Sequence, residues 1–471
     1  MKDNLLNNFF SFSNHTDLIA IVSNNHQLTY KELFDQSKTI AGFLASKQIK
    51  KNDYAPILIE DQFYFIKTII GLWYLGAIPV VINSRLLEKE IISIIEDYGF
   101  NLLISDKHIN NELNHIENIK IDFHQLLHSE DIYSDISIPN NDEEAVVIFT
   151  SGTSGRPKGV VHTFSSLIKS IENGNQILMH QEKARWLASL PFYHIGGFQI
   201  LCRSLYYGCT IVLPESLKTD DLVTAITKLN PTHISLASAQ LQKFIYLGMK
   251  ASKSVRITLV GGGFVDDELM FEAEKLGWKP YRVYGSSETA SMVTAISANE
   301  IILKPQSVGK PFNNIEIKIS DDSEILIKSN SLFTKYLGDE KETSSKLING
   351  FYHSGDLGFV DVDGYLFIEA RRNDLIVTGG ENVNPIEVEM AILHIVGIRD
   401  VCVFAKQDKT WGQIVVCAIV KEDNFINEKM IKEILKQQLA GYKIPKQFFF
   451  TDILPRTSLG KLEREKIKKM F

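Results

Sequence analysis

The chain has 471 residues, 44% of them hydrophobic and 23% charged, and a formal net charge of -7. A chain of this length exceeds one hydrophobic core, so we expect roughly two to four core units in a globular fold. The negative net charge gives no general attraction to nucleic acid or to an anionic membrane surface, which leaves a small molecule as the expected partner.

The cysteines and the first residues of the chain indicate the compartment. Cys202, Cys209, Cys402 and Cys417 form no CxxC pair and have no histidines at zinc-binding spacing. They are typical of thiols in a reducing compartment. Residues 1–17 have neither the long apolar region nor the small-residue cleavage site of a signal peptide. We therefore predict a cytoplasmic protein, and the sequence makes no prediction about its oligomeric state.

Helical patterns alternate with short β-branched runs along the first part of the chain. The helical pattern of residues 30–49 precedes "YAPILI" (54–59), and that of residues 86–100 precedes "NLLIS" (101–105). The alternation continues to "ITLVGGG" (257–263), where a strand ends in glycines. This arrangement is typical of a parallel sheet covered by helices, so we predict an α/β fold for this part of the chain.

One apolar stretch, "FYFIKTIIGLWYLGAIPVVI" (63–82), is as long as a membrane span. However, Lys67 lies within it, and Gly76 and Pro79 would interrupt a spanning helix. We predict instead a buried helix that ends at about Leu75, a turn, and a buried strand. No membrane span is expected.

From about residue 310 the pattern changes. Short strands and turns such as "IEIKISDDSEILIKS" (315–329) indicate antiparallel β structure. The last block carries helices and strands of its own, enough for a small α+β domain. We predict a large N-terminal domain of helix-covered sheets with a β-rich subdomain (1–370), a hinge (371–374) and a small α+β C-terminal domain (375–471).

The stretch "IFTSGTSGRPKGVVH" (148–162) ends an apolar strand in a polar, cationic loop. Its N–H groups, hydroxyls and ammonium group suit a phosphate. The residues that would supply them are Thr150, Ser151, Gly152, Thr153, Ser154, Gly155 and Lys158. The Walker A pattern is excluded, because Pro157 precedes the lysine and Gly159 follows it. Taken alone, the stretch also fits a mobile surface loop rich in turn residues.

Four further motifs follow this loop. They are "VYGSSETA" (283–290), "YHSGDLGFVDVDGY" (352–365), "ARRNDLIVTGGENVNPIEVE" (370–389) and "PRTSLGKLERE" (455–465). With the loop, they resemble the adenylate-forming superfamily of acyl-CoA synthetases, adenylation domains of peptide synthetases and firefly luciferase, over nearly the whole chain. The resemblance implies a mobile C-terminal domain and a two-step reaction. ATP and a carboxylic acid, with Mg²⁺, give an acyl-adenylate and pyrophosphate, and a thiol such as CoA then displaces AMP.

The resemblance also assigns catalytic positions. Lys461 matches the family's catalytic lysine, which bridges the attacking carboxylate and the α-phosphate. Both groups are anionic, so a cation between them lowers the charge barrier. Glu288 matches the family's magnesium ligand, and Ser287 stands where threonine is usual, which keeps the hydroxyl. Outside these motifs, Lys461 would be one more solvated lysine and Glu288 a carboxylate stabilised by a helix dipole.

Further matched positions concern the nucleotide. Tyr284 would cover the adenine face, Asp356 would accept both ribose hydroxyls, and Arg371 would reach the same sugar. The alternative for Asp356 is a surface turn. The glycines that would let the backbone approach the base are Gly261, Gly262 and Gly263.

The acyl and thiol sites have fewer signals. His194, followed by Gly196 and Gly197, lies where the family places an aromatic residue or a histidine beside the acyl pocket, although a lone histidine is often structural. Gly379 and Gly380 match a loop that lines the thiol tunnel, or form only a turn.

The hinge motif departs from its commonest form. Asp374 matches the pivot, but Ala370 replaces a glycine and Asn373 replaces a lysine. These departures leave open the details of the hinge and any contact of residue 373 with the thiol donor.

Within the superfamily, "WLASLPFYHIGGFQILCRSLYYGCTIVL" (186–213) and the motifs above most resemble the 2-succinylbenzoate–CoA ligases of menaquinone biosynthesis. The departure is "ASA" (237–239), where "VPT" is common. Two enzyme alternatives remain: a CoA ligase for another aryl or medium-chain acid, and a stand-alone adenylation enzyme that loads a carrier protein. A non-enzymatic nucleotide-binding protein is disfavoured, because both Glu288 and Lys461 are present.

Overall fold

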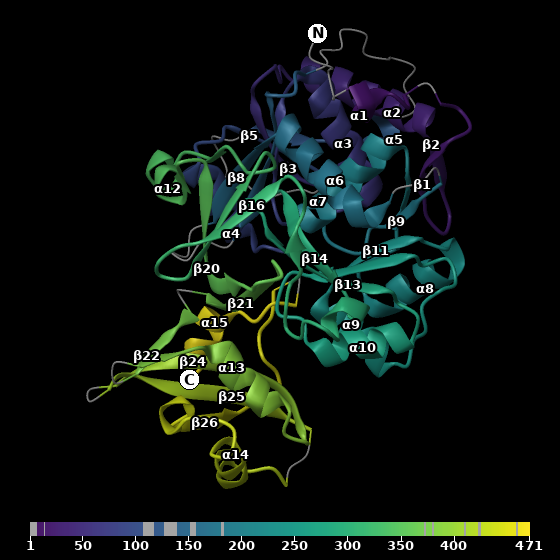
Figure 1. Cartoon of the computed structure of the whole chain (residues 1–471). Helices are drawn as coiled ribbons and strands as arrows, with labels where there is room; N and C mark the ends of the chain where they lie inside the picture. Colours follow the sequence, from purple (N-terminus) through teal and green to yellow (C-terminus); the bar gives the residue numbers. More distant parts are fainter. Residues whose placement is uncertain are drawn as a thin grey trace. The chain divides into compact units, whose positions relative to one another are not determined.

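The computed structural model describes residues 7–13, 15–106, 117–126, 139–150, 157–179, 183–371, 374–378, 381–408, 411–422, 425–457 and 460–471. The chain forms two compact units, whose elements are labelled in Figure 1. Unit 1 comprises residues 1–305, 309–316 and 328–352, and unit 2 comprises residues 306–308, 317–327 and 353–471. The chain therefore enters each unit more than once. The domain boundaries at 370–375 stay a prediction.

The first sheet of unit 1 has nine strands in the order β15-β14-β13-β12-β11-β9-β10-β1-β2. They are β1 (Ile19–Val22), β2 (Gln27–Thr29), β9 (Arg185–Leu187), β10 (Thr210–Val212), β11 (His233–Ala237), β12 (Ile257–Gly261), β13 (Pro280–Ser286), β14 (Ser291–Ser297) and β15 (Lys310–Pro311). In this sheet order, neighbouring strands from β13 to β1 pair in parallel. Strand β2 at one edge, and strands β14 and β15 at the other, pair antiparallel with their neighbours. The predicted parallel sheet is confirmed.

The second sheet of unit 1 has seven strands in the order β18-β8-β7-β4-β3-β5-β6. They are β3 (Tyr54–Leu58), β4 (Ile78–Val81), β5 (Leu102–Ser105), β6 (Glu117–Lys120), β7 (Glu144–Thr150), β8 (Lys158–Thr163) and β18 (Lys335–Tyr336). The five strands from β7 to β6 are parallel, whereas β8 and β18 are antiparallel to their neighbours. The apolar run in β7 is buried, as a central strand requires.

Helices pack against these sheets (Figure 1). They are α1 (Asn7–Phe10), α2 (Tyr30–Ser46), α3 (Gln62–Leu75), α4 (Glu88–Asp97), α5 (Phe123–Leu126), α6 (Phe164–Leu178), α7 (Ile195–Tyr207), α8 (Thr219–Leu229), α9 (Ser238–Tyr246), α10 (Asp267–Lys275), α11 (Ala298–Ile301) and α12 (Glu340–Lys346). A capping box starts α2, because Thr29 Oγ1 accepts from the N–H of Glu32 while the Glu32 carboxylate accepts from the N–H of Thr29.

The long apolar stretch of residues 63–82 forms α3, a turn and β4, as predicted. The carboxylate of Asp61 accepts from the N–H of Tyr64 (3.0 Å) at the start of α3, and Gly76 ends the helix in the left-handed conformation (φ 68°). The helix is buried from Phe65 onward. In the part of the chain that the structure describes, no helix is long and apolar enough to cross a membrane.

Residues 315–371 contain a five-stranded sheet in the order β16-β17-β20-β19, with β21 beside β20. Its strands are β16 (Ile315–Ile319), β17 (Glu324–Ser329), β19 (Leu347–Ile348), β20 (Phe351–Val360) and β21 (Leu366–Arg371). Strand β20 pairs antiparallel with both β19 and β21. The predicted change to antiparallel β structure is confirmed for these pairs.

The C-terminal part of unit 2 is an α+β arrangement, as predicted. Its sheet has the order β23-β22-β25-β24, with β26 beside β25. Its elements are β22 (Ile376–Thr378), β23 (Glu381–Val383), α13 (Pro385–Leu393), β24 (Ile398–Asp408), β25 (Gly412–Lys421), α14 (Glu428–Leu435), β26 (Gln447–Phe450) and α15 (Arg464–Lys468). Apolar side chains of α13, α14 and the sheet form one buried core, which includes Val388, Val403 and Ile431.

Candidate active site

The predicted phosphate loop connects two antiparallel strands of the second sheet. Thr150, the last residue of β7, pairs with Lys158, the first residue of β8. The ammonium group of Lys158 lies 2.5 Å from Glu342 Oε1 and 5.4 Å from the centre of the Tyr336 ring. These contacts hold a cation where the loop ends. The predicted loop residues Ser151, Gly152, Thr153, Ser154 and Gly155 lie outside the described residues.

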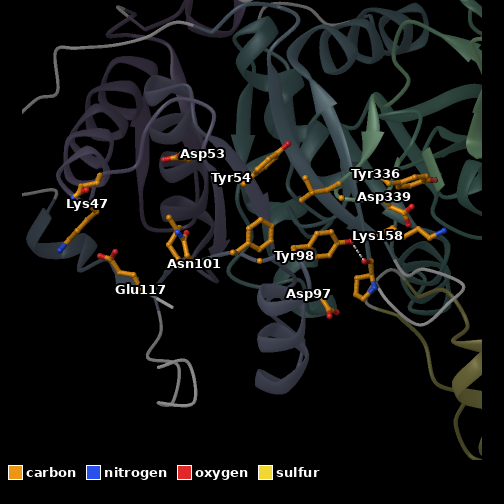
Figure 2. Close-up of a pocket in the computed structure, with 17 residues that line it drawn as sticks. Lys47, Asp53, Tyr54, Asp97, Tyr98, Asn101, Glu117, Lys158, Tyr336 and Asp339 are labelled. Atoms are coloured by element: carbon orange, nitrogen blue, oxygen red, sulfur yellow. Dashed lines mark hydrogen bonds between the residues drawn. The ribbon is translucent and has the colours of Figure 1, made fainter. Parts of the chain in front are cut away.

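Tyr98 fixes the backbone at the end of this loop. Its hydroxyl donates to the carbonyl oxygen of Pro157 (2.8 Å) and accepts from the N–H of Gly159 (3.2 Å). A cavity of about 660 Å³ lies here, and Figure 2 shows Tyr98, Lys158 and Tyr336 among its lining residues. Sequence reasoning missed Tyr98, because no local pattern marks a tyrosine that bonds to a distant loop.

The predicted magnesium ligand, Glu288, lies in the turn between β13 and β14. The hydroxyl of Tyr336 donates to Glu288 Oε1 (2.9 Å), and the N–H of Phe333 donates to the Glu288 carbonyl oxygen (2.8 Å). Burial first, and the Glu288 carboxylate second, raise the pKa of Tyr336 far above its usual value. The phenol therefore stays protonated and can donate. Tyr336 thus contacts both Glu288 and Lys158, a role that the sequence motifs did not reveal.

The surroundings of Glu288 fit a magnesium ion. The Tyr336 hydroxyl occupies Oε1, and among the described residues no donor is bonded to Oε2. Glu288 is half-buried, so its carboxylate is not sealed inside the protein. Mg²⁺ prefers carboxylate oxygens and keeps several waters, which agrees with a half-buried carboxylate that has one oxygen without a donor among the described residues. The assignment of Glu288 as a magnesium ligand stays a prediction.

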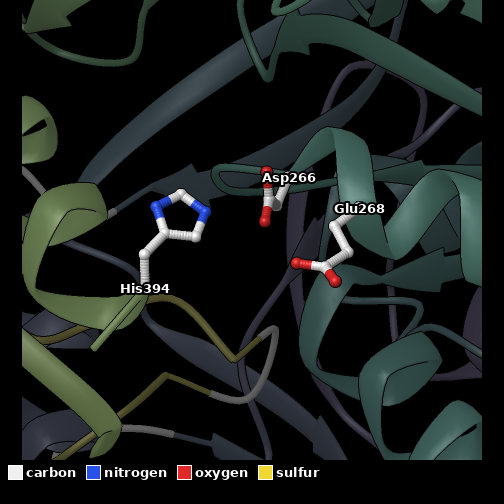
Figure 3. Close-up of side chains that lie close together, drawn as sticks. All are labelled: Asp266, Glu268 and His394. Carbon is white, nitrogen blue, oxygen red and sulfur yellow. The ribbon is translucent and has the colours of Figure 1, made fainter. Parts of the chain in front are cut away.

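Two other carboxylates, Asp266 and Glu268, lie at the N-terminus of α10 (Figure 3). Negative charge at that end interacts favourably with the helix dipole, so a structural role accounts for both. His394, also drawn in Figure 3, is the residue that ends α13 in unit 2. None of these three residues belongs to the predicted site.

His162 supports the Glu288 turn from β8. It is fully buried, with Nε2 2.7 Å from the carbonyl oxygen of Ser287 and Nδ1 3.0 Å from Ser166 Oγ. Burial lowers the pKa of His162 to about 4, so the ring is neutral near pH 7. A carbonyl oxygen can only accept, so Nε2 carries the proton and donates to Ser287. A histidine inside a β-branched strand was the one signal for this role.

The predicted adenine residues lie on neighbouring strands, since β12 ends at Gly261 and Tyr284 lies in β13. A Cβ atom on Gly261 would lie 2.8 Å from a side-chain carbon of β13, and Gly262 has a positive φ of 79°. Both glycines are therefore required by the fold. A Cβ atom on Gly263 would meet nothing nearer than Ser238 Oγ, at 3.9 Å. The fold therefore tolerates a Cβ atom at Gly263, and the adenine role of this residue stays a prediction.

The predicted acyl residues lie at the start of α7. His194 precedes the helix, and burial first and Arg85 second lower its pKa to about 4. The imidazole is therefore neutral near pH 7. A Cβ atom on Gly197 would lie 2.1 Å from the carbonyl oxygen of Pro191, whereas one on Gly196 would meet a side-chain carbon at 3.1 Å. Gly197 is needed for packing, and the acyl role of these residues stays a prediction.

The predicted ribose and lysine residues lie in unit 2. Asp356 pairs with Arg371 across β20 and β21, with Arg371 Nε 3.3 Å from Asp356 Oδ1. Lys461 is exposed as a whole, but desolvation of its ammonium group lowers the pKa of Lys461 below its usual value. Arg371 lowers this pKa further, whereas Asp374 and Asp356 oppose the shift. The four predicted residues therefore influence one another electrostatically.

The predicted site residues thus form two groups, one in each unit. Unit 1 holds the loop ends, the Glu288 turn with Ser287, the adenine residues and His194. Unit 2 holds Asp356, Arg371, Asp374 and Lys461. The predicted tunnel residues Gly379 and Gly380 lie outside the described residues.

Gly285→Ala should disrupt the Glu288 turn. An added Cβ atom would lie 2.0 Å from the carbonyl oxygen of Ser291, which belongs to the facing strand, so β13 and β14 would have to separate. We expect a loss of about 1–3 kcal/mol in unfolding free energy, with weaker binding of Mg²⁺–ATP. Gly263→Ala is the control: its melting temperature should be unchanged while ATP affinity falls. Equal melting temperatures for both variants would contradict the steric argument.

His162→Gln should reduce the acid sensitivity of unit 1. The folded pKa of about 4 lies below the ordinary 6.5, so the unfolded chain binds more protons and stability falls as the pH drops from 6.5 towards 4. The linked free energy is on the order of 3 kcal/mol. Glutamine keeps a donor and an acceptor but does not titrate. Urea unfolding at pH 7.5 and 5.0 should show a smaller difference than in the parent, whereas exposed His26→Gln should match the parent.

Two family models match the chain. The model for AMP-binding enzymes matches residues 10–337, and the model for the AMP-binding enzyme C-terminal domain matches residues 387–461. A 2-succinylbenzoate–CoA ligase from Bacillus subtilis (strain 168) is 32% identical over 461 residues, covering 96% of this chain and 94% of the relative. Its counterpart from Listeria monocytogenes serotype 4b (strain F2365) is 31% identical over 459 residues, covering 96% of each.

Solved structures agree with these relatives. The o-succinylbenzoate CoA synthetase (MenE) from Bacillus subtilis, in complex with the acyl-adenylate intermediate OSB-AMP, superposes with a TM-score of 0.91 at 31% identity, covering 99% of this chain and 98% of that one. The same synthetase in complex with ATP and a magnesium ion gives a TM-score of 0.89 at 30% identity, covering 99% of each chain. The chain therefore belongs to the AMP-binding enzyme family, the adenylate-forming superfamily that its motifs predicted.

Proposed function

We propose that the protein is an ATP-dependent acid–CoA ligase that converts 2-succinylbenzoate to 2-succinylbenzoyl-CoA through an acyl-adenylate. The observation that carries this proposal is the match, along nearly the full length of both chains, to enzymes of that name and to a structure that holds the acyl-adenylate. The chain has both residues that adenylation would need: Glu288 for the magnesium ion and Lys461 for the α-phosphate. The reaction would serve menaquinone biosynthesis.

The first half-reaction depends on charge. The attacking carboxylate and the α-phosphate repel each other, so a cation that contacts both lowers the barrier without being consumed. Lys461 would supply this cation, and Asp356 and Asp374 help to keep its ammonium group protonated. A magnesium ion, held by Glu288, would neutralise phosphate charge when bound. Tyr336 would orient the Glu288 carboxylate, and Ser287 would offer its hydroxyl to phosphate.

Nucleotide binding would use groups from both units. Lys158 and the loop between β7 and β8 would hold the β- and γ-phosphates, which leave as pyrophosphate. The carboxylate of Asp356 would accept the ribose hydroxyls, and Arg371, 3.3 Å away, would orient it. Tyr284 and the glycines after β12 would hold the adenine.

The second half-reaction would transfer the acyl group to CoA. We propose that residues 371–374 act as the hinge between the domains 1–370 and 375–471, with Asp374 at the pivot and Gly379 and Gly380 beside the thiol. A cytoplasmic location belongs to the same proposal, since ATP and CoA are available there. The four cysteines, all buried free thiols, suit a reducing compartment.

One observation favours a second candidate, a CoA ligase for another aryl acid. The segment 237–239, at the junction of β11 and α9, reads "ASA" where the resembled ligases commonly have "VPT". Ser238 Oγ lies close to Gly263, so this segment borders the predicted nucleotide site. A changed side chain there would reshape the neighbouring acyl pocket.

A panel of acids tests the substrate. With Mg²⁺, ATP and CoA, the protein should release pyrophosphate and form 2-succinylbenzoyl-CoA, and omission of any component should stop formation of the thioester. Product formation is read by mass spectrometry of the CoA thioesters. Turnover of benzoates or hexanoate, without product from 2-succinylbenzoate, would replace the main proposal by the second candidate.

Lys461→Ala should separate the two half-reactions. Adenylation, measured as acid-dependent exchange of pyrophosphate into ATP, should fall by about 100-fold or more, because the charge at the α-phosphate is no longer neutralised. Thioester formation from CoA and supplied acyl-adenylate should change little, since that step does not need this cation. Equal loss in both half-reactions would show that the assigned role of Lys461 is wrong.

A further inference from the structure

Lys461 lies in a short hairpin, the lysine hairpin, which we define as residues 456–457 and 460–462. Arg456 and Leu462 form an antiparallel β-bridge. The N–H of Thr457 donates to the carbonyl oxygen of Lys461 (2.8 Å), and the N–H of Lys461 donates to Thr457 Oγ1 (3.2 Å). A lysine side chain is long and flexible, so a catalytic ammonium group can be placed accurately only if its backbone is fixed.

Arg464 lies two residues after the lysine hairpin and forms a bidentate ion pair with Glu389. Its Nη1 lies 2.5 Å from Glu389 Oε1 and its Nη2 lies 2.7 Å from Glu389 Oε2. Nη1 also donates to the carbonyl oxygen of Val403 (2.5 Å), and the N–H of Val403 donates back to Glu389 Oε1 (2.7 Å). One side chain therefore joins the start of α15 to α13 and to β24.

This ion pair is largely buried, so a change in its geometry is costly. The side chains of Arg464 and Glu389 are 16% and 10% exposed. Burial raises the pKa of Glu389, and Arg464 opposes that shift. Loss of either partner leaves an uncompensated buried charge, and the planar guanidinium fixes direction as well as distance. The same guanidinium has its Nε 3.7 Å from Asp374 Oδ2, in the predicted hinge.

A second, more exposed ion pair supports the other side of the lysine hairpin. The guanidinium of Arg456 contacts both carboxylate oxygens of Asp400 at 2.6 and 3.2 Å and donates to the carbonyl oxygen of Gly460 (2.5 Å). The side chains of this pair are 35% and 21% exposed. Exposed pairs contribute little to stability, so the buried anchor nearest to Lys461 along the chain is Arg464, three residues later.

We propose that Arg464 is a positioning residue for the adenylation step, because its buried contacts with Glu389 and Val403 determine where Lys461 presents its ammonium group. The inference rests on the proposed role of Lys461. Arg464 itself touches no reacting atom in this scheme. The residue acts through the backbone of the lysine hairpin, and its contact with Asp374 joins that hairpin to the segment about which the C-terminal domain is proposed to turn.

Arg464→Lys is the main test, because lysine keeps the charge but cannot form the two-pronged contact. We expect pyrophosphate exchange to fall by about tenfold or more, since a small displacement of the catalytic group is costly. Thioester formation from supplied acyl-adenylate should change by less than about threefold. In the Lys461→Ala background, Arg464→Lys should cause no additional loss of adenylation, as expected for residues that act as one unit.

Lys466→Ala is the matched control. Lys466 lies in the same helix, is 66% exposed and is 3.5 Å from Glu463, so its removal deletes one positive charge without touching Glu389, Val403 or Asp374. Both half-reactions should remain at parental rates. Equal losses in both half-reactions for Arg464→Lys, an unchanged adenylation rate, or an additive loss in the Lys461→Ala background would each overturn the proposal.

Hydrogen exchange supplies a readout that does not depend on the substrate. The amides of Gly460 and Lys461 are bonded within the lysine hairpin, so they should exchange faster in Arg464→Lys while amides of β25 keep their protection. Glu389→Gln, which retains an acceptor for Val403, should produce the same local change and guards against a variant that fails to fold. Parental exchange in both variants would overturn the inference even if no acid of the panel were a substrate.

Discussion

The hydrogen bond from Tyr336 to Glu288 joins two distant parts of the chain at the candidate site of unit 1. A half-buried carboxylate needs a donor, and the donor comes from a two-residue strand, β18, that pairs with β8. Because β8 also carries His162 and begins at Lys158, the pairing of β8 with β18 positions Lys158, which we propose as a phosphate-binding residue, together with the Glu288 carboxylate and its turn. The chemistry of unit 1 therefore depends on backbone pairing between segments far apart in the sequence.

Unit 2 positions its predicted catalytic cation, Lys461, in a different way. Its cation lies on an exposed hairpin that a short stretch of backbone pairing closes, and arginine–carboxylate pairs add to those backbone hydrogen bonds. The guanidinium group suits this task because it fixes an angle as well as a distance. Anchoring of this kind can survive rotation of the proposed C-terminal domain as a rigid body, since Glu389 and Val403, which hold Arg464, both lie in that domain.

Sequence patterns predicted the elements whose cause is local. The alternation of helices and strands and the break at Gly76 follow from burial and backbone geometry within one segment. Motifs predicted Glu288 and Lys461 as site residues but did not reveal Tyr98, Tyr336 and His162, because the contacts of these three arise only from long-range pairing. For Gly197, the motif predicted a place beside the acyl group. The close approach of the Pro191 carbonyl oxygen is by itself a reason for a glycine at this position.

The interleaved chain has a consequence for synthesis. Residues 328–352 belong to unit 1 but follow residues 317–327 of unit 2, so unit 1 is incomplete until the ribosome has made part of its neighbour. Until then, the edge of β8 lacks its partner strand, and an open strand edge invites pairing with other chains. Over the same interval the Glu288 turn lacks the contacts that Phe333 and Tyr336 make with it in the folded protein.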